Sequence, residues 1–294
     1  MKIMVFDVGG TEIKYSVMDE QMHRTDSGAV PTPQDTQAQF LDAVYRLYAP
    51  HKDEVSGIAM ALPGFVDNRT GYVSNGGALL YNTATPVGQL LAEKCGCPVI
   101  LENDGKAAAM AELANGALKD CCNAAVFIIG TGVGGGIIAN GQLVRGVHFT
   151  AGEYSFVNTN AEAWDAPDQN MACQCSTSNL LKWYRARKAL PEDAPLDGRS
   201  FFAAANAGEP EALEVLRRFC HAVAVQIYNL TVLLDVEKVA IGGGISKQPL
   251  LLESLRSAYD GLYASRAGQA YMEGLPRCQI VPCACLLYTS DAAD

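Results

Sequence analysis

One pattern occurs twice in this chain and limits the folds it can adopt more than any other feature. A β-rich run, a glycine turn and a second β-rich run follow one another around DVGGT (residues 7–11) and again around GTGVGGG (residues 130–136). In both copies the glycines are flanked by short runs of branched and apolar residues, as in the two strands of a β-hairpin. The repeat predicts an α/β protein of two similar halves, each presenting one glycine turn to a shared cleft.

The length of the chain agrees with two domains, because 294 residues suffice for two of ordinary size. We place the boundary near residues 116–122, which gives an N-terminal α/β domain over 1–118 and a C-terminal α/β domain over 119–294. The spacing of apolar residues predicts helices over 37–48, 87–95, 105–118 and 210–234, and strands over 55–62, 98–101 and 236–241. In the second copy of the repeat, we expect the strand that follows the glycines at 137–139, before the Asn140-Gly141 hairpin turn.

Composition excludes several classes of protein. A hydrophobic share of 49% with 18% charged residues is typical of a globular protein. The formal net charge is −10 and no run of Lys and Arg occurs, so we expect no nucleic-acid partner. The 24 residues from Cys121 to Val144 carry no charge, but their six Gly and two Asn predict strands and turns and not a membrane span. The chain has ten cysteines, and its first residues, MKIMVFDVGG, do not form the apolar core of a secretory signal peptide. We therefore expect a cytoplasmic location, in which the thiols stay reduced.

The glycine turns have the chemistry of anion sites. Glycine tolerates φ > 0 and has no Cβ, so backbone amides can come close to a phosphate. In the first turn Thr11 adds a hydroxyl, and Asp7 can hold Mg²⁺, usually through water because magnesium keeps several waters. A plain hairpin turn would use the same glycines. A third run, Gly242 to Gly244, follows a predicted strand, where it can end the strand or approach a nucleotide.

Gly130, Gly132 and Gly135 also satisfy the dinucleotide-binding pattern G-x-G-x-x-G. That fingerprint requires a helix immediately after the glycines, because the helix N-terminus holds the pyrophosphate. Here Ile137 and Ile138 follow and predict a second strand. We therefore interpret the turn as a site for the β and γ phosphates of a nucleotide.

Asp104 lies between a predicted strand and a predicted Ala-rich helix. A carboxylate at this place can accept the proton of an attacking hydroxyl. Asn103 or Asp104 could equally cap the helix by accepting hydrogen bonds from its first amides. The residues alone leave both roles open, including the case in which one caps and the other is catalytic.

Six motifs, in this order, resemble those of the ROK family of bacterial sugar kinases and repressors: DVGGT (7–11), ALPG (61–64), LENDGKAAAMAE (101–112), GTGVGGG (130–136), AGE (151–153) and AIGGGIS (240–246). They cover most of the chain. The resemblance implies two α/β domains of the ribonuclease H-like, actin/hexokinase ATPase fold, often in a homodimer. It also implies transfer of the γ-phosphate of ATP to a hydroxyl, usually at C6, of a small-molecule hexose.

The resemblance further implies roles for single residues. Asp104 would be the general base that deprotonates the acceptor hydroxyl. The residues that would bind the sugar are Gly64, Gly77, Asn103, Asp104 and Glu153. The residues that would bind ATP, with Mg²⁺ at Asp7, are Asp7, Gly9, Gly10, Thr11, Thr131, Gly132, Gly134, Gly242 and Gly243.

Two departures from the family pattern change these expectations. Many members hold structural zinc with one histidine and three cysteines, but here Phe156 and Leu180 replace the histidine and the third cysteine, leaving Cys173 and Cys175. Two thiols cannot complete a four-ligand tetrahedral site, so we expect no structural zinc. The family's sugar-contacting glutamate after the last cysteine is also missing, which leaves the identity of the sugar open. The ending, PCACLLYTSDAAD, is unlike the family's, and we expect a truncated or foreign terminus from about Leu286.

Other functions remain compatible with these motifs. An N-acetylhexosamine kinase, in particular for N-acetylmannosamine, or a β-glucoside kinase would use the same machinery. A sugar-responsive repressor would carry an N-terminal helix-turn-helix, whereas this chain reaches DVGGT at residue 7. A sugar-binding protein without catalysis is less compatible with the presence of Asp104.

Overall fold

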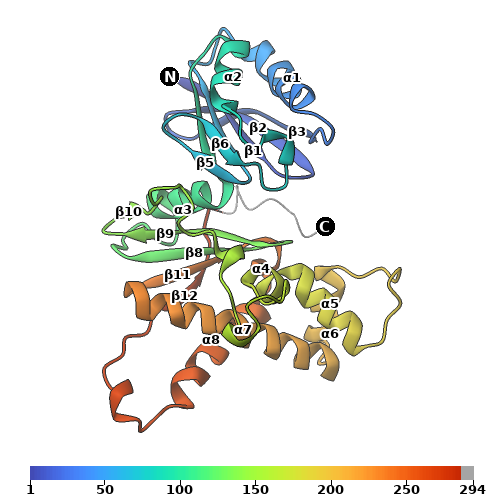
Figure 1. Cartoon of the computed structure of the whole chain (residues 1–294), viewed down its shortest axis with the longest axis vertical. Helices are drawn as coiled ribbons and strands as arrows, with labels where there is room; N and C mark the ends of the chain where they lie inside the picture. Colours follow the sequence, from blue (N-terminus) through green and yellow to red (C-terminus); the bar gives the residue numbers. More distant parts are fainter. Residues whose placement is uncertain (286–294) are drawn as a thin grey trace. The chain divides into compact units, whose positions relative to one another are not determined.

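The computed structural model describes residues 1–285, which form two compact units (Figure 1). Unit 1 comprises Met1–Ala107 together with Arg145–Thr150, and unit 2 comprises Ala108–Val144 and the chain from Ala151 onward. Each unit contains one five-stranded sheet. The foreign terminus expected from Leu286 lies outside the described residues.

The sheet of unit 1 has the strand order β3-β2-β1-β4-β7. Its antiparallel strands are β1 (Lys2–Val8), β2 (Glu12–Asp19) and β3 (Arg24–Pro31), and its strands parallel to β1 are β4 (Ile58–Leu62) and β7 (Val99–Asn103). The connections contain α1 (Gln37–Tyr48), the β5 (Phe65–Asp67) and β6 (Tyr72–Asn75) hairpin, and α2 (Val87–Cys95). The hairpin predicted around DVGGT is confirmed, with Val8 paired to Ile13.

Alternation along β1 decides which side chains reach the core of unit 1. Met4, Phe6 and Val8 are fully buried in one apolar cluster that also includes Phe40 and Val44 of α1. The intervening residues point to the other face, because successive side chains of a strand alternate. Asp7 therefore lies on the face opposite this cluster, near the carboxyl end of β1.

The sheet of unit 2 repeats this arrangement with the order β10-β9-β8-β11-β12. Its antiparallel strands are β8 (Ala124–Ile129), β9 (Val133–Ala139) and β10 (Gln142–Leu143), and its strands parallel to β8 are β11 (Lys238–Gly242) and β12 (Gln279–Pro282). Asn140 and Gly141 make the predicted turn, both with positive φ (52° and 71°). The two units are thus similar halves, as the repeat in the sequence predicts.

One predicted limit is wrong in this sheet. The second strand begins at Val133 and not at Ile137, so Gly134 to Gly136 lie in a strand and not in the turn. Gly135 explains why the strand contains glycine, because its φ is +147° and a Cβ there would overlap the carbonyl oxygen of Val126 on β8. The glycines lead into a strand and not into a helix, which confirms that the dinucleotide fingerprint does not apply.

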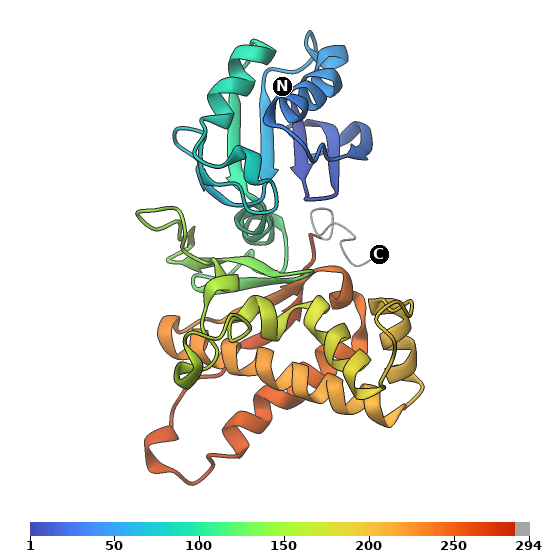
Figure 2. The same ribbon diagram turned by 45° about the vertical axis from the view of Figure 1, so that its right-hand side comes forward.

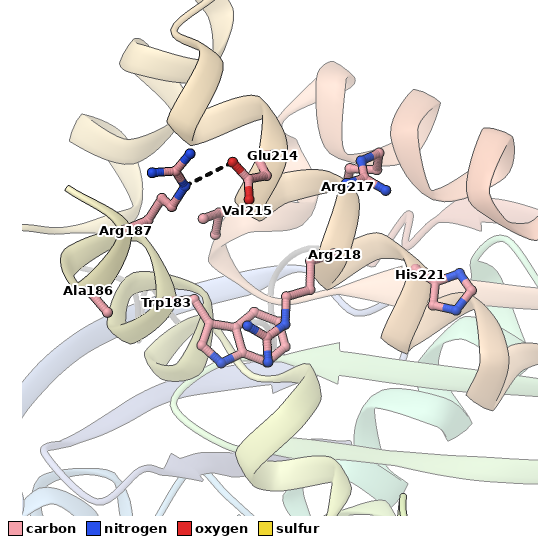
Figure 3. A pocket seen from close by; sticks show the side chains of 8 residues that line it. All are labelled: Trp183, Ala186, Arg187, Glu214, Val215, Arg217, Arg218 and His221. Atoms are coloured by element: carbon pink, nitrogen blue, oxygen red, sulfur yellow. Dashed lines mark hydrogen bonds and ion pairs between the residues drawn. The ribbon is translucent and has the colours of Figure 1, made fainter.

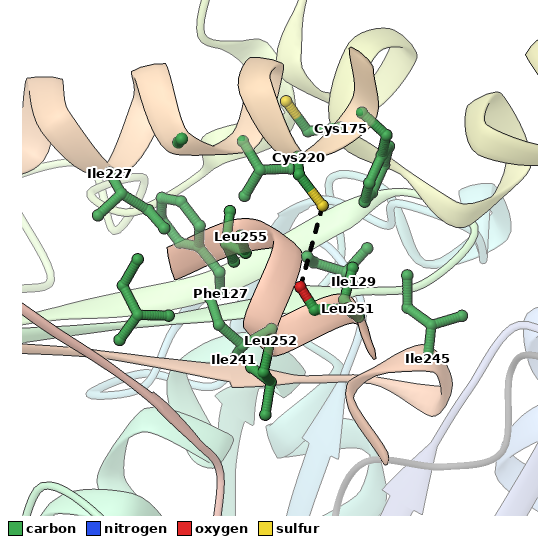
Figure 4. Close-up of a cluster of buried hydrophobic side chains, with 14 of the residues drawn as sticks. Phe127, Ile129, Cys175, Cys220, Ile227, Ile241, Ile245, Leu251, Leu252 and Leu255 are labelled. Atoms are coloured by element: carbon green, nitrogen blue, oxygen red, sulfur yellow. Dashed lines mark hydrogen bonds between the residues drawn. The ribbon is translucent and has the colours of Figure 1, made fainter. Parts of the chain in front are cut away.

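Helices cover both faces of the second sheet. The helices of unit 2 are α4 (Met171–Cys175), α5 (Thr177–Arg187), α6 (Gly198–Asn206), α7 (Pro210–Leu234) and α8 (Pro249–Ala264), and α3 (Asp104–Asn115) enters this unit at Ala108. Figures 1 and 2 show α7 and α8 side by side on one face. Figure 4 shows Phe127 and Ile129 of β8 packed there with Ile227 and Leu255. Val126 faces the other way and packs with Ala109 of α3.

The uncharged stretch from Cys121 to Val144 forms β8, β9 and β10 with their turns. It is apolar because strand β8 is buried on both faces. Throughout residues 1–285, no helix combines the length and the apolar character needed to cross a membrane.

A buried carboxylate joins α3 to the chain that follows β12. Glu112 is 1% exposed, and its side chain accepts hydrogen bonds from the backbone N–H groups of Ala117 (2.7 Å), Ala284 (3.1 Å) and Cys285 (2.7 Å). A charged acceptor makes each such bond stronger than a neutral one, and a buried amide left without an acceptor is costly. Glu112 therefore anchors α3 and the end of the second sheet to each other.

We expect Glu112→Gln to destabilise the protein by about 2 kcal/mol or more, because the new NH₂ group faces backbone donors that the carboxylate now satisfies. Thermal unfolding should show a midpoint lower by roughly 4 °C or more. Glu253→Gln on the exposed surface of α8 is the matched control and should leave the midpoint unchanged. Equal midpoints for the two variants would contradict the anchoring role.

Candidate active site

In unit 1, the predicted site residues come together at the carboxyl ends of the parallel strands. Asp7 is next to last in β1, Gly64 follows β4 by two residues, and Asn103 is the last residue of β7. Parallel neighbours end at the same edge of a sheet, which is where open α/β sheets bind ligands. Asp104 follows Asn103 directly, so the topology places the carboxylates of Asp7 and Asp104 and the amide of Asn103 at a single edge.

Asn103 organises this edge. Its side chain is nearly buried (5% exposed), and its Oδ1 accepts from the backbone N–H of Lys106 at 3.0 Å, which is the bond of a helix N-cap. Its Nδ2 donates to the carbonyl of Gly64 and to Oδ1 of Asp104, each at 3.0 Å. The capping role thus belongs to Asn103, and the exposed Asp104 carboxylate is held by Asn103 and by the N–H of Gly105 at 2.7 Å.

Asp7 and Asp104 influence each other electrostatically. Burial raises the pKa of Asp7 from 3.8 to about 6, the negative charge of Asp104 adds to this, and Lys14 opposes it. A cation beside Asp7 would relieve both unfavourable effects. Carboxylate oxygens are the ligands that Mg²⁺ prefers, so this pair fits a magnesium ion that is bound together with phosphates.

The first glycine turn is held through its carbonyl groups. The Thr32 hydroxyl donates to the carbonyl of Gly9 at 2.8 Å, and Gln34 Nε2 donates to the carbonyl of Gly10 at 2.7 Å. The amide of Gly9 donates to the carbonyl of Glu12 at 2.9 Å, whereas the amides of Gly10 and Thr11 donate to no acceptor within residues 1–285. Such outward amides can bind an anion. Thr32 and Gln34 follow a strand that the sequence did not predict, and no motif marks them.

The predicted sugar-side glycines are in backbone contact. Gly64 has φ +99°, and a Cβ there would overlap the carbonyl oxygen of Asn75. Gly77 has φ +57°, and its N–H donates to Asn75 Oδ1 at 2.8 Å. Because Asn103 bonds the carbonyl of Gly64, the turn at 75–77 is connected through Gly64 to Asp104.

A segment far along the chain also belongs to unit 1. Arg145 donates from Nε and Nη2 to Oε2 of Glu102, both at 2.9 Å, and Glu102 Oε1 accepts from the N–H of Asn103 at 3.0 Å. In the same segment, Phe149 has φ 59° and lies under the Arg69 guanidinium, 4.7 Å from the ring centroid. Glu102, Arg145 and Arg69 are not among the site residues predicted from the sequence. The connection that leads to Glu153 is therefore fixed beside Asn103.

In unit 2, the remaining predicted residues lie along β8, β9 and β11. Thr131 and Gly132 form the tight turn between β8 and β9, where Gly130 N–H donates to the Gly132 carbonyl at 3.0 Å. Gly134 is in β9, two residues further on. Gly242 pairs with Ile128. Gly243 has φ +94°, and a Cβ there would overlap the carbonyl oxygen of Ile129, so both the backbone conformation and the available space require glycine.

Glu153 follows a glycine that lies against β9. Gly152 has φ +79°, and a Cβ there would be 3.2 Å from Cα of Gly136. The next residue, Tyr154, is buried and donates from its hydroxyl to the carbonyl of Gly136 at 3.1 Å. Both contacts fix the backbone on either side of Glu153.

The segment for which the family resemblance raised the question of structural zinc lies on α4 and α5 and in the chain before them. Cys173 and Cys175 are on α4, and Leu180 on α5 is fully buried in the main apolar cluster of unit 2. Phe156 is 69% exposed. An apolar side chain thus fills the position of the third thiol, and the absence of zinc remains a prediction.

Comparisons with known proteins identify the family of the chain. The model of the ROK family matches residues 3–278. A β-glucoside kinase of Listeria innocua is 31% identical over 258 residues, 87% of each chain, and an N-acetyl-D-glucosamine kinase of Vibrio atlanticus is 30% identical over 277 residues, 85% of this chain and 86% of that one. The crystal structure of a ROK family protein from Streptococcus pneumoniae in complex with sucrose superposes with a TM-score of 0.84 at 28% identity, covering 99% of this chain and 96% of that one.

The repeated sheets, the glycine turns at their edges and these similarities agree with one another. The fold is the two-domain α/β architecture of the actin/hexokinase-like ATPases, and the chain belongs to the ROK family.

Proposed function

We propose that this protein is an ATP-dependent sugar kinase that transfers the γ-phosphate to a hexose hydroxyl, at C6, with Asp104 as general base. The observation that carries the proposal is the exposed Asp104 carboxylate, held by the buried Asn103 at the edge where Asp7 also lies. The relatives named above are sugar kinases, which supports the reaction class. Sucrose in the pneumococcal structure supports a sugar as the acceptor.

The proposed step is an in-line displacement at the γ-phosphorus. The Asp104 carboxylate accepts the proton of the sugar hydroxyl, the hydroxyl oxygen forms a bond to phosphorus, and the bond to the β–γ bridging oxygen breaks, releasing ADP. Asn103 contributes by holding Asp104 and, through the Gly64 carbonyl, the sugar-side turn. Such positioning supplies much of the acceleration in phosphoryl transfer.

We propose that both glycine turns bind nucleotide phosphate: in unit 1 through the amides of Gly10 and Thr11, and in unit 2 through the turn at Thr131 and Gly132. Gly242 and Gly243 would approach the adenosine. Asp7 would hold Mg²⁺ through water, where the ion would neutralise phosphate charge. Gly64, Gly77, Asn103 and Glu153 would bind the sugar.

Asp104→Asn should abolish sugar-dependent turnover, because the amide cannot accept the hydroxyl proton. We expect a loss of about 10²- to 10⁴-fold in ADP release from Mg·ATP, the range typical of a general base. The assay should cover glucose, β-glucosides, N-acetylglucosamine and N-acetylmannosamine, since the acceptor that gives the highest kcat/KM identifies the sugar. Asp53→Asn, an exposed change in the same unit, should keep full activity. Full activity of Asp104→Asn, or no stimulation by any sugar, would contradict the mechanism.

Asp7→Asn should stabilise the protein at neutral pH while it removes activity. The folded-state pKa of Asp7 is about 6 against an ordinary value of 3.8, so wild-type stability falls as pH rises through this interval. At pH 7.5 the uncharged variant avoids this penalty, which is up to about 3 kcal/mol. Thermal unfolding without nucleotide should therefore give a higher midpoint for the variant at pH 7.5, with a smaller difference at pH 5.

Asp35→Asn, on the exposed surface of the same unit, is the matched control and should not change the midpoint at either pH. Added Mg·ATP should raise the midpoint of the wild type more than that of Asp7→Asn. An unchanged midpoint for Asp7→Asn at pH 7.5 would show that the carboxylate is not destabilised by its surroundings.

Metal analysis tests the proposed absence of structural zinc. Because Phe156 and Leu180 occupy the ligand positions, protein purified without chelator should contain well under one zinc per chain. Treatment with a strong chelator should also leave the unfolding midpoint unchanged, since no part of the fold would depend on the metal. Near-stoichiometric zinc that resists desalting would overturn this proposal.

A further inference from the structure

Unit 2 contains a pocket that none of the proposed ATP or sugar residues lines. It lies between α5 and α7 and has a volume of about 540 Å³ (Figure 3). Its polar and aromatic lining comes from Trp183, Arg187, Glu214, Arg217, Arg218 and His221. The volume is within the range of about 300–1,000 Å³ that is common for small-molecule sites.

The pocket concentrates positive charge in an acidic protein. Three arginines and one histidine line it beside a single glutamate, although the chain as a whole has a formal charge of −10. Arg187 Nε pairs with Glu214 Oε2 at 2.8 Å. Arg217 has no ion-pair or hydrogen-bond partner within residues 1–285. The three arginines against the one glutamate give the lining two positive charges in excess.

The remaining contacts give the pocket an aromatic side. The Arg218 guanidinium stacks over the indole of Trp183 at 3.8 Å from the ring centroid, and Figure 3 shows the two side chains in contact. Stacking orients the planar guanidinium and leaves its edge N–H groups available for hydrogen bonds. Val215 is buried and also lines the pocket.

We propose that this pocket binds a phosphate monoester. A phosphate dianion matches the two excess charges, and guanidinium groups bind phosphate oxygens through paired, charge-assisted hydrogen bonds. Phosphate alone would fill only a small part of the volume, so the organic part of the ester would lie against Trp183 and Val215. A sugar phosphate and free inorganic phosphate share this chemistry.

Trp183 provides a direct measurement. The chain has two tryptophans, and Trp164 is 73% exposed outside the pocket, so Trp164→Phe leaves Trp183 as the single indole. A ligand that engages Arg218 changes the stacking over this ring. We expect glucose 6-phosphate, added without ATP, to give a saturable change in fluorescence with a dissociation constant below about 1 mM, which corresponds to about 4 kcal/mol of binding free energy.

Arginine variants test the origin of the signal. Arg217→Ala should weaken binding by about tenfold or more, the usual effect of losing a charged hydrogen bond, and Arg217→Lys should weaken it less. Arg24→Ala, which removes the same charge from the exposed β3, should bind as the wild type does. Arg218→Ala removes the group that stacks over Trp183 and so changes the fluorescence itself. Its affinity should therefore be measured by calorimetry, where we expect the same weakening of binding. Inorganic phosphate should compete, and the ratio of the two affinities shows how much the organic part contributes.

The proposal is overturned if neither probe gives a saturable signal up to about 10 mM, well above common metabolite-site constants. Equal affinity in Arg217→Ala and wild type would also overturn it, since binding at the proposed sugar site does not depend on Arg217. The proposal is also overturned if Arg217→Ala changes the sedimentation coefficient but not the affinity for glucose 6-phosphate. In that case the arginines would be covered by a second copy of the chain and would not bind a phosphate ester. The titration measures binding without ATP and involves no catalysis. Its result therefore does not depend on whether the Asp104→Asn assay supports the proposed kinase reaction.

Discussion

The Asn103 side chain makes three hydrogen bonds, and the candidate site of unit 1 depends on all three. One bond caps α3, one holds the Gly64 carbonyl, and one holds the Asp104 carboxylate. A buried amide has few ways to satisfy its donors and acceptor at once, so its orientation is well determined. The helix start, the sugar-side turn and the proposed base are therefore positioned together, and moving any one of them would break a hydrogen bond of the buried Asn103 side chain.

Much of this architecture can be predicted from local chemistry. The hairpin at DVGGT, the limits of α1 and α7 and the strand–glycine–strand repeat follow from alternation, helical spacing and glycine, whereas the order of the strands in each sheet comes only from the structure. The sugar-side role of Gly64 and Gly77 comes from the family resemblance and stays a prediction, whereas their positive φ values explain why both positions hold glycine. The roles of Asn103 and Asp104 could not be separated from sequence, since either side chain can cap a helix.

The residues that sequence reasoning missed act across long separations. Thr32 and Gln34 bond a turn more than twenty positions earlier, and Arg145 bonds Glu102 from 43 positions away. Nothing in a local pattern specifies such pairs, because tertiary packing selects the partner. The strand limit at Val133 was missed for a related reason: glycine usually indicates a turn, but here close approach to Val126 and Tyr154 requires it inside a strand. The pocket between α5 and α7 likewise needs two helices whose packing the sequence does not reveal.

The bonds of Glu112 have a consequence for the order in which the protein is made. Two of its three partners, Ala284 and Cys285, lie 172 and 173 residues further along the chain. During synthesis on the ribosome, the residues of α3 are made long before Ala284 and Cys285. Until these two residues exist, Ala117 is the only one of the three backbone donors that Glu112 can bond. The helix that begins at Asp104 thus acquires these two partners only after residues 284 and 285 have been synthesised, so its anchoring to the second sheet cannot be completed by the first half of the chain.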